Sequence, residues 1–232
     1  MFETVQIAPS ILSADFMNME QDIRMLEAGG AGYVHVDVMD GHFVPNLTLG
    51  VPFVSQLKKI TDIPLDVHLM ISNPLVQVPW FLEAGADIVT VHIEALDESA
   101  GEVDRIITMI HEAGVRAALS LNPDTNTEVL RPYIADLDMV LLMSVFPGFS
   151  GQSYIEGTDQ RVAQVVALAR EAHAAPLIQV DGGIGLATVA CVAREGADVF
   201  VCGNAVFKAP DPQAAIAEVS RLATAAAAGK LA

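Results

Sequence analysis

Residues 26–36 read LEAGGAGYVHV, where a helical pattern stops at glycines and a buried strand begins a few residues later. Glycine often ends a helix because it adopts the left-handed backbone conformation without steric cost. Similar endings recur as LEAGADIVTV, HEAGVRAAL and REGADVFV, at residues 82–91, 111–119 and 194–201. Each predicts a helix that turns back into the next strand, and a strict alternation of strands and helices is typical of a parallel sheet.

Eight short apolar segments are the predicted strands. They cover residues 7–12, 33–38, 64–70, 87–93, 115–121, 139–145, 176–180 and 198–203. Segments with helical spacing lie between them. Eight strand–helix units favour a closed (β/α)8 TIM barrel over an open doubly wound sheet. Because no Pro-rich or Ser-rich linker divides the chain, we expect one domain over residues 1–232, with a helical tail that becomes weakly ordered from about residue 224.

Composition limits the classes of partner. The chain has 29 acidic and 12 basic residues and a net charge of −17, the wrong sign for general attraction to nucleic acid or anionic lipid. Cys191 and Cys202 fit neither a disulfide framework nor a metal motif, which indicates reduced core thiols. No leader peptide and no apolar run of about 18 residues is found. We therefore expect a cytoplasmic protein without membrane or nucleic-acid partners.

Polar and methionine side chains gather where the second, third and seventh predicted strands end. Residues two apart on a strand share a face, and the C-terminal ends of barrel strands form one mouth. The residues placed there are His35, Asp37, Met39, Asp66, His68, Met70 and Asp181. Imidazoles with carboxylates predict a divalent metal site, for zinc or for manganese, iron or cobalt.

Glycine-rich loops follow the last three predicted strands. They read SVFPGFSGQS, VDGGIG and CGNAVF, at residues 144–153, 180–185 and 202–207. Backbone amides at such loops, together with a helix N-terminus, can hold a phosphate without a cationic side chain. The loops after strands 7 and 8 are the usual phosphate site of this fold. A phosphorylated small molecule is the expected ligand.

Six segments together resemble the ribulose-phosphate 3-epimerase family in order and spacing, from about residue 7 to about residue 210. They are APSILSADF (8–16), HVDVMDGHFVPNLTLG (35–50), LDVHLMI (65–71), SVFPGFSGQSY (144–154), VDGGI (180–184) and CGNAVF (202–207). The resemblance implies a metal-dependent 3-epimerase of a ketose phosphate, in a homo-oligomer. D-ribulose 5-phosphate and D-xylulose 5-phosphate are the favoured pair.

The resemblance also implies roles for individual residues. It makes His35, Asp37, His68 and Asp181 the ligands of one divalent ion per subunit, with zinc favoured and iron, manganese or cobalt as alternatives. Asp37 and Asp181 are also the implied acid/base pair, one on each side of the substrate. The implied substrate and phosphate contacts are Ser10, His68, Gly148, Phe149, Ser150, Gly151, Gly182, Gly183, Gly203 and Asn204. Met39, Met70, Met143 and Phe146 are expected to line the site.

Three positions depart from the family pattern. Phe146 replaces a polar residue and Ser150 a glycine in FPGFSGQ, and Asn204 stands where serine is common. These changes are either neutral or alter sugar specificity, so D-allulose 6-phosphate is an alternative substrate. His92 and Glu94 share a face of the fourth strand, where we expect them to support the site rather than to react.

Two other classes of function fit the residues less well. A Schiff-base lyase needs a lysine at a strand end, and none of Lys58, Lys59, Lys208 and Lys230 is well placed. A non-catalytic sugar-phosphate sensor would keep the phosphate loops but would not need both aspartates and both histidines. The epimerase is therefore the favoured hypothesis.

Overall fold

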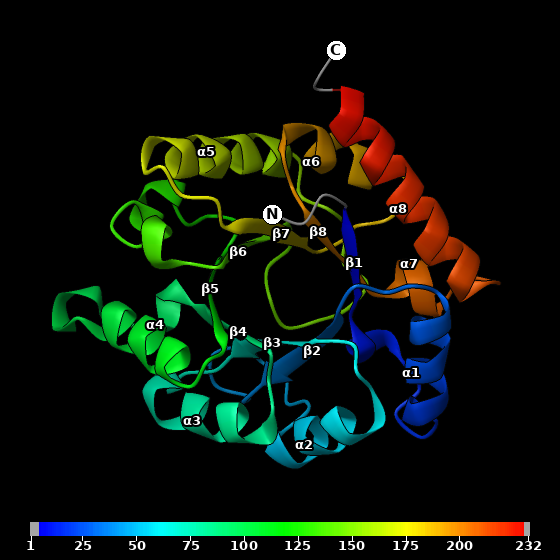
Figure 1. Ribbon diagram of the computed structural model, residues 1–232, viewed down its shortest axis with the longest axis horizontal. Coiled ribbons are helices and arrows are strands. Elements are labelled where there is room, and N and C mark those ends of the chain that lie inside the picture. Colours follow the sequence, from blue (N-terminus) through cyan, green and yellow to red (C-terminus); the bar gives the residue numbers. More distant parts are fainter. Residues whose placement is uncertain (1–4, 230–232) are drawn as a thin grey trace.

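The eight apolar segments form eight parallel strands in the computed structural model, which describes residues 5–229 (Figure 1). The strands are β1 (Gln6–Pro9), β2 (Val34–Met39), β3 (Leu65–Met70), β4 (Ile88–His92), β5 (Arg116–Leu121), β6 (Met139–Met143), β7 (Leu177–Asp181) and β8 (Val199–Cys202). Their order in the sheet is β1-β8-β7-β6-β5-β4-β3-β2. A parallel bridge between Ser10 and His35 joins β1 to β2, and the Gly32 amide donates to the Ile7 carbonyl at 2.9 Å. The predicted TIM barrel is confirmed.

Helices surround the strands on the outside of the ring (Figure 1). They are α1 (Met19–Ala28), α2 (Val51–Ile60), α3 (Pro74–Ala84), α4 (Glu102–Glu112), α5 (Thr158–Glu171), α6 (Val189–Glu195), α7 (Asn204–Phe207) and α8 (Pro212–Ala228). The predicted glycine stops are present at Gly85 and Gly196, whose φ angles of 97° and 111° lie in the left-handed region after α3 and α6. Between β5 and β6 the described chain forms two 3-10 helices, Thr127–Leu130 and Ile134–Asp136, instead of an α-helix.

The core lies between the strands and the helices. Val34, Val36 and Val38 of β2 are all buried in it, while His35 and Asp37 occupy the alternate positions, which face the barrel interior. Every residue of β2 and β3 is buried, so the polar side chains of these strands are removed from bulk water. Burial of this kind requires that each polar group find a partner.

The first strand differs from expectation in its length, and the predicted helix at the C-terminal end is present in part. The first predicted strand stops at Pro9, because Ser10 begins a 3-10 turn over Ile11–Ser13 and its side chain accepts from the Leu12 amide. Residues 224–228 belong to α8, and the last part of the predicted tail, residues 230–232, lies outside the described residues. Within residues 5–229, no helix is long and apolar enough to cross a membrane.

Candidate active site

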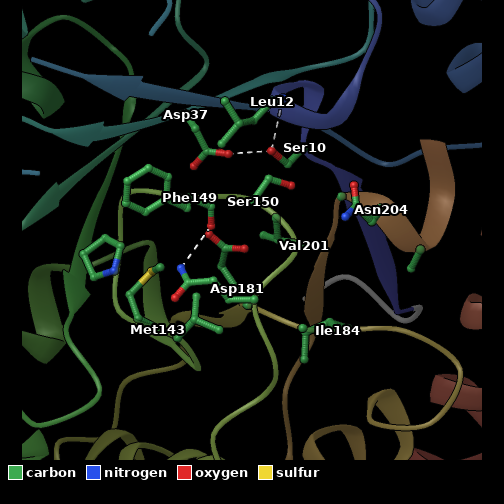
Figure 2. Close-up of a pocket in the computed structure, with 18 of the residues that line it drawn as sticks. Ser10, Leu12, Asp37, Met143, Phe149, Ser150, Asp181, Ile184, Val201 and Asn204 are labelled. Atoms are coloured by element: carbon green, nitrogen blue, oxygen red, sulfur yellow. Dashed lines mark hydrogen bonds between the residues drawn. The ribbon is translucent and has the colours of Figure 1, made fainter. Parts of the chain in front are cut away.

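A cavity of about 320 Å³ opens at the C-terminal ends of the strands (Figure 2). Six of the residues predicted at the strand ends or in the site line it, namely Ser10, Asp37, Met39, Met70, Met143 and Asp181. The predicted phosphate-binding residues line it as well, at positions 148–151, 182, 183, 203 and 204. A cavity of this size suits a small molecule, since ligand pockets typically begin at about 300 Å³.

The glycine loops bring backbone close to the cavity. Gly182 and Gly183 have φ angles of 122° and 62°, which favour glycine, and a Cβ on Gly183 would lie 2.5 Å from the Tyr154 nitrogen. The hydroxyls of Ser13 and Ser150 are 2.7 Å apart and join the turn after β1 to the loop after β6. No lysine or arginine is found among the described residues that line the cavity, so backbone amides and hydroxyls are the groups available to an anion.

Three predicted site residues, His35, His68 and Phe146, are not among the residues that line the cavity. The side chain of Phe146 is exposed, while its neighbours Val145 and Pro147 form part of the wall. The role of Phe146 in the site therefore stays a prediction. His68 is fully buried and is not among the residues that line the cavity, so its predicted contact with the substrate stays a prediction.

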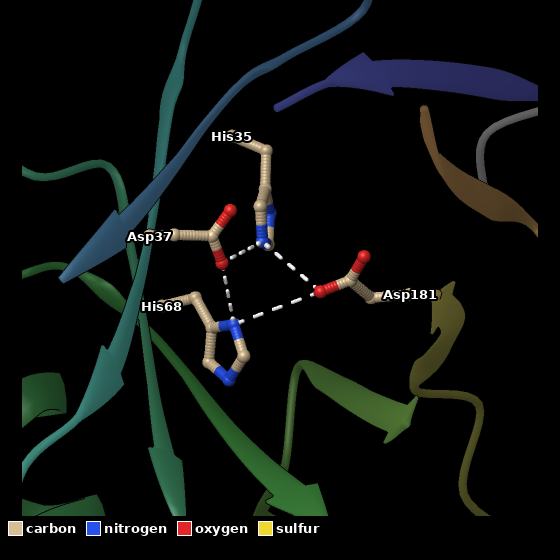
Figure 3. Close-up of side chains that lie close together, drawn as sticks. All are labelled: His35, Asp37, His68 and Asp181. Atoms are coloured by element: carbon tan, nitrogen blue, oxygen red, sulfur yellow. Dashed lines mark hydrogen bonds and ion pairs between the residues drawn. The ribbon is translucent and has the colours of Figure 1, made fainter. Parts of the chain in front are cut away.

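A compact cluster of His35, Asp37, His68 and Asp181 lies at the floor of the cavity, which Asp37 and Asp181 line (Figure 3). One donor atom from each side chain lies within 4.8 Å of the others. The Asp37 Oδ1 atom is 3.3 Å from His35 Nε2 and 3.1 Å from His68 Nδ1. The Asp181 Oδ2 atom is 3.9 Å from the same two nitrogens. The strand register explains this, since Asp37 pairs with His68 on the adjacent β3.

This donor set fits a divalent cation. Two imidazole nitrogens and two carboxylate oxygens are typical ligands of zinc and of other mixed N/O-binding ions. The buried His35 Nε2 atom makes no hydrogen bond within residues 5–229, and it points into the cluster (Figure 3). A cation at the centre would satisfy this nitrogen and would offset the charge of the two carboxylates.

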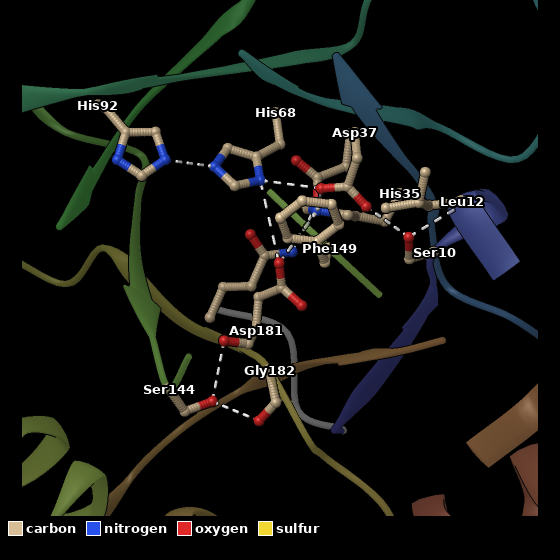
Figure 4. A network of polar contacts seen from close by, with 12 residues as sticks. Ser10, Leu12, His35, Asp37, His68, His92, Ser144, Phe149, Asp181 and Gly182 are labelled. Carbon is tan, nitrogen blue, oxygen red and sulfur yellow. Dashed lines mark hydrogen bonds and ion pairs between the residues drawn. The ribbon is translucent and has the colours of Figure 1, made fainter. Parts of the chain in front are cut away.

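Partners behind the cluster orient its members (Figure 4). His35 Nδ1 is 2.7 Å from Asp66 Oδ2, which also accepts a hydrogen bond from Gln179 Nε2 at 2.5 Å. The Ser10 hydroxyl donates to Asp37 Oδ2 at 2.5 Å. The sequence places Asp66 at this strand end without giving it a role, and it does not predict Gln179. The only signal for Gln179 in the sequence is an amide within the apolar segment PLIQV.

The four cluster residues have shifted pKa values. Burial opposes ionisation of Asp37, but the positive charge of His35, together with the contacts that both histidines make with this carboxylate, outweighs it and holds the Asp37 pKa well below its usual range. Burial, with the negative charge of Asp37, raises the pKa of Asp181 to about 7. Burial opposes protonation of His35, yet the charges of Asp66 and Asp37 raise the His35 pKa well above its ordinary value. Burial lowers the pKa of His68.

Known proteins resemble this chain in both sequence and fold. The chain matches the model of the ribulose-phosphate 3 epimerase family over residues 6–207. It is 45% identical over 216 residues to the ribulose-phosphate 3-epimerase of Bacillus subtilis (strain 168), covering 93% of this chain and 98% of that one. It is 44% identical over 220 residues to the ribulose-phosphate 3-epimerase of Mycobacterium bovis (strain ATCC BAA-935 / AF2122/97), covering 95% and 93%. A solved 3-hexulose-6-phosphate synthase shares the fold, with a TM-score of 0.63 at 20% identity over 94% of this chain and 99% of that one.

Proposed function

The chain belongs to the ribulose-phosphate 3-epimerase family, and we propose that it interconverts D-ribulose 5-phosphate and D-xylulose 5-phosphate. The observation that carries this proposal is the pair of carboxylates, Asp37 and Asp181, that meet two histidines at the floor of the cavity. Moving a proton at a carbon next to a carbonyl needs a base on one face and an acid on the other. Figure 3 shows the two carboxylates reaching the cluster from opposite sides.

In this mechanism Asp37 removes the C3 proton and Asp181 returns one to the opposite face, and the roles exchange in the reverse direction. The Ser10 hydroxyl, which donates to Asp37 Oδ2, holds that carboxylate in one orientation. Ser144 fixes the backbone of Asp181 on the other side of the cluster, because its hydroxyl donates to the Asp181 carbonyl at 2.8 Å. Fixed bases on two sides avoid any need to rotate the intermediate in the site.

His35, Asp37, His68 and Asp181 would hold one divalent ion per subunit, with zinc as the first choice and iron, manganese or cobalt as alternatives. When bound, the ion supplies positive charge where negative charge develops on the two oxygens of the reacting ketose. Met39, Met70 and Met143 line the same cavity. Their apolar side chains exclude water, which protects a reactive carbanion from solvent protons.

We propose that the loops after β6, β7 and β8 bind the phosphate. Positions 148–151, 182, 183, 203 and 204 all line the cavity, and residues such as Ser150 and Asn204 offer a hydroxyl and an amide. Backbone N–H groups in such concave loops bind anions without a cationic side chain. This arrangement explains how a protein with a net charge of −17 holds a phosphorylated substrate.

The proposed setting is a cytoplasmic homo-oligomer. Cys191 and Cys202 are free thiols, a form that a reducing compartment maintains. The oligomeric state follows from the family resemblance and stays a prediction, which light scattering of the purified protein would test.

Steady-state kinetics with two substrates tests the proposed function. D-ribulose 5-phosphate and D-allulose 6-phosphate are compared at equal concentrations, with the metal content measured on the same sample. We expect a higher kcat/KM for the five-carbon sugar and one divalent ion per subunit. A strong preference for the six-carbon sugar would show that D-allulose 6-phosphate is the substrate. Cleavage of a C–C bond would show that the protein is a lyase and not an epimerase.

A further inference from the structure

A second imidazole and a carboxylate stand behind His68, on the side away from the cavity. His68 Nε2 is 2.9 Å from His92 Nε2 (Figure 4), and His92 Nδ1 is 3.2 Å from Glu94 Oε2. Both histidines are fully buried. The other nitrogen of His68, Nδ1, is the one that faces Asp37 and Asp181. A continuous chain of polar contacts therefore runs from the cluster to Glu94.

The direction of each hydrogen bond in this series of contacts follows from its last member, Glu94. An ionised glutamate only accepts hydrogen bonds, so His92 must donate from Nδ1 to Glu94. A neutral imidazole that carries its proton on Nδ1 can only accept at Nε2. His68 must then donate from Nε2 to His92. This leaves His68 Nδ1 without a proton, with its lone pair directed at the cluster.

Glu94 is itself anchored as an acceptor. Its Oε1 atom accepts from the Asn122 amide at 2.7 Å and from the Thr125 hydroxyl. The loop that carries these two donors is held by Arg161 of α5, whose guanidinium donates to the Asn122 and Thr125 carbonyls at 2.8 and 2.9 Å. The arrangement that orients His68 thus extends from the cluster to the outer layer of the barrel.

The two histidines of the cluster are oriented by different means. His35 contacts a carboxylate directly, since Asp66 Oδ2 lies 2.7 Å from its Nδ1 and leaves Nε2 for the cluster. His68 faces the cluster with the opposite nitrogen, Nδ1. Its Nε2 atom is linked to the Glu94 carboxylate only through the imidazole of His92. Outer partners of this kind fix the tautomer and the ring orientation of a metal-binding histidine.

We propose that His92 and Glu94 are positioning residues that keep His68 as the Nε2-protonated tautomer, so that its Nδ1 lone pair is available to a divalent ion. This inference rests on the proposed function of the cluster as a metal site. It assigns a role to two residues that do not line the cavity and are not among the four that could hold an ion.

The variant Glu94→Gln tests this role with almost no change in shape. The carbonyl oxygen of the new side-chain amide would keep the two donors from Asn122 and Thr125, so its NH₂ group would face His92 Nδ1 and donate to it. The hydrogen bonds between residue 94 and His92 and between His92 and His68 would then both reverse direction. His68 would carry its proton on Nδ1, facing the cluster. We expect the affinity for Zn²⁺ to fall by about 10- to 100-fold, the usual cost of losing such a partner.

The affinity is measured by competition with a chromophoric chelator, with circular dichroism to verify folding. Glu112→Gln serves as the matched control, because it removes one carboxylate from the exposed surface of α4 and should leave the affinity unchanged. An affinity for Glu94→Gln equal to that of the wild type would overturn the proposal. Failure of the wild type to bind Zn²⁺ would instead overturn the metal site of the proposed function.

A second measurement needs no variant. In the Zn²⁺-loaded wild type labelled with ¹⁵N-histidine, NMR should show His68 protonated at Nε2 and His92 protonated at Nδ1. The opposite pair of tautomers would contradict the proposal even if Glu94→Gln did not fold.

Discussion

Asp37 and Asp181 are carboxylates of one cluster in unlike surroundings. Asp37 is almost fully buried and accepts a hydrogen bond from Ser10, whereas 18% of the Asp181 side chain remains exposed at the cavity. Such a pair is a common basis for acid/base chemistry, in which two similar groups receive different roles from their environments.

Replacing either carboxylate tests the two-base mechanism. We expect Asp37→Asn and Asp181→Asn each to lower kcat by at least about 10²- to 10⁴-fold, the usual contribution of a general acid or base. Metal content is measured on each variant, so that a lost ion is distinguished from a lost base. Asp62→Asn, on the exposed surface, is the control. Turnover at the wild-type rate in either active-site variant would rule out the mechanism.

The shifted pKa values predict that metal binding releases protons. Although burial opposes protonation of His35, nearby carboxylates raise its pKa well above its ordinary value, and burial raises the pKa of Asp181 to about 7, so His35 is protonated and Asp181 is partly protonated near neutral pH. A cation must displace these protons, and the apparent affinity for Zn²⁺ should therefore rise with pH. Chelator competition at pH 6, 7 and 8 checks the sign, and an affinity independent of pH would contradict it.

At the scale of elements, the loop between β6 and α5 forms one side of the cavity wall. Two hydrogen bonds connect this loop to the loops that follow β2 and β1. Asn46 Nδ2 donates to the Gly148 carbonyl at 2.8 Å, and the Ser13 and Ser150 hydroxyls are 2.7 Å apart. Phe149, in the middle of this loop, lines the cavity and is 56% exposed. A loop held by few contacts opens at low free-energy cost.

The variant Asn46→Ala should loosen this loop selectively. Loss of one hydrogen bond costs about 1 kcal/mol, which corresponds to roughly fivefold faster local hydrogen exchange if opening controls the rate. We expect this increase at residues 146–152, with no change in β2 or β3. The neighbouring exposed Leu47 provides the control Leu47→Ala. Equal exchange in both variants would show that the Asn46 contact does not hold the loop.

The strands were predictable to within a few residues because their apolar runs and glycine stops are local signals. The first strand was predicted too long, since Ile11 and Leu12 are as apolar as strand residues and only the cap at Ser10 shows the turn. Phe146 lies in the loop after β6, and its side chain is exposed. Whether a loop side chain faces a cavity depends on the path of the backbone, which the residue types alone do not specify.

At the scale of the whole molecule, closure of the barrel creates contacts that no single segment encodes. The pairing of His35 with Asp66 needs the register between β2 and β3, and the hydrogen bond from Gln179 to Asp66 needs side chains 113 positions apart. The four cluster residues could be predicted because they lie at alternate positions of strands whose side chains meet inside the barrel. The hydrogen-bond partners of these residues could not be predicted, because the sequence of one strand does not specify its register with the neighbouring strand.

The overall charge predicts an effect of salt on substrate capture. A net charge of −17 repels a sugar phosphate at long range, and the screening length shrinks from about 30 Å at 0.01 M salt to about 8 Å at 0.15 M. We expect kcat/KM for D-ribulose 5-phosphate to rise over this range, measured with an inert salt such as sodium chloride. A steady fall with added salt would indicate that local positive potential at the cavity dominates instead.

The most direct test of the central claim is an incubation with D-ribulose 5-phosphate in deuterated water, followed by NMR. Two bases that exchange protons with solvent should produce D-xylulose 5-phosphate that carries deuterium at C3. Asp181→Asn, checked for retained metal, should form that product far more slowly. Product without solvent deuterium at C3, or no product at all, would contradict the proposal that Asp37 and Asp181 epimerise a ketose phosphate by proton transfer.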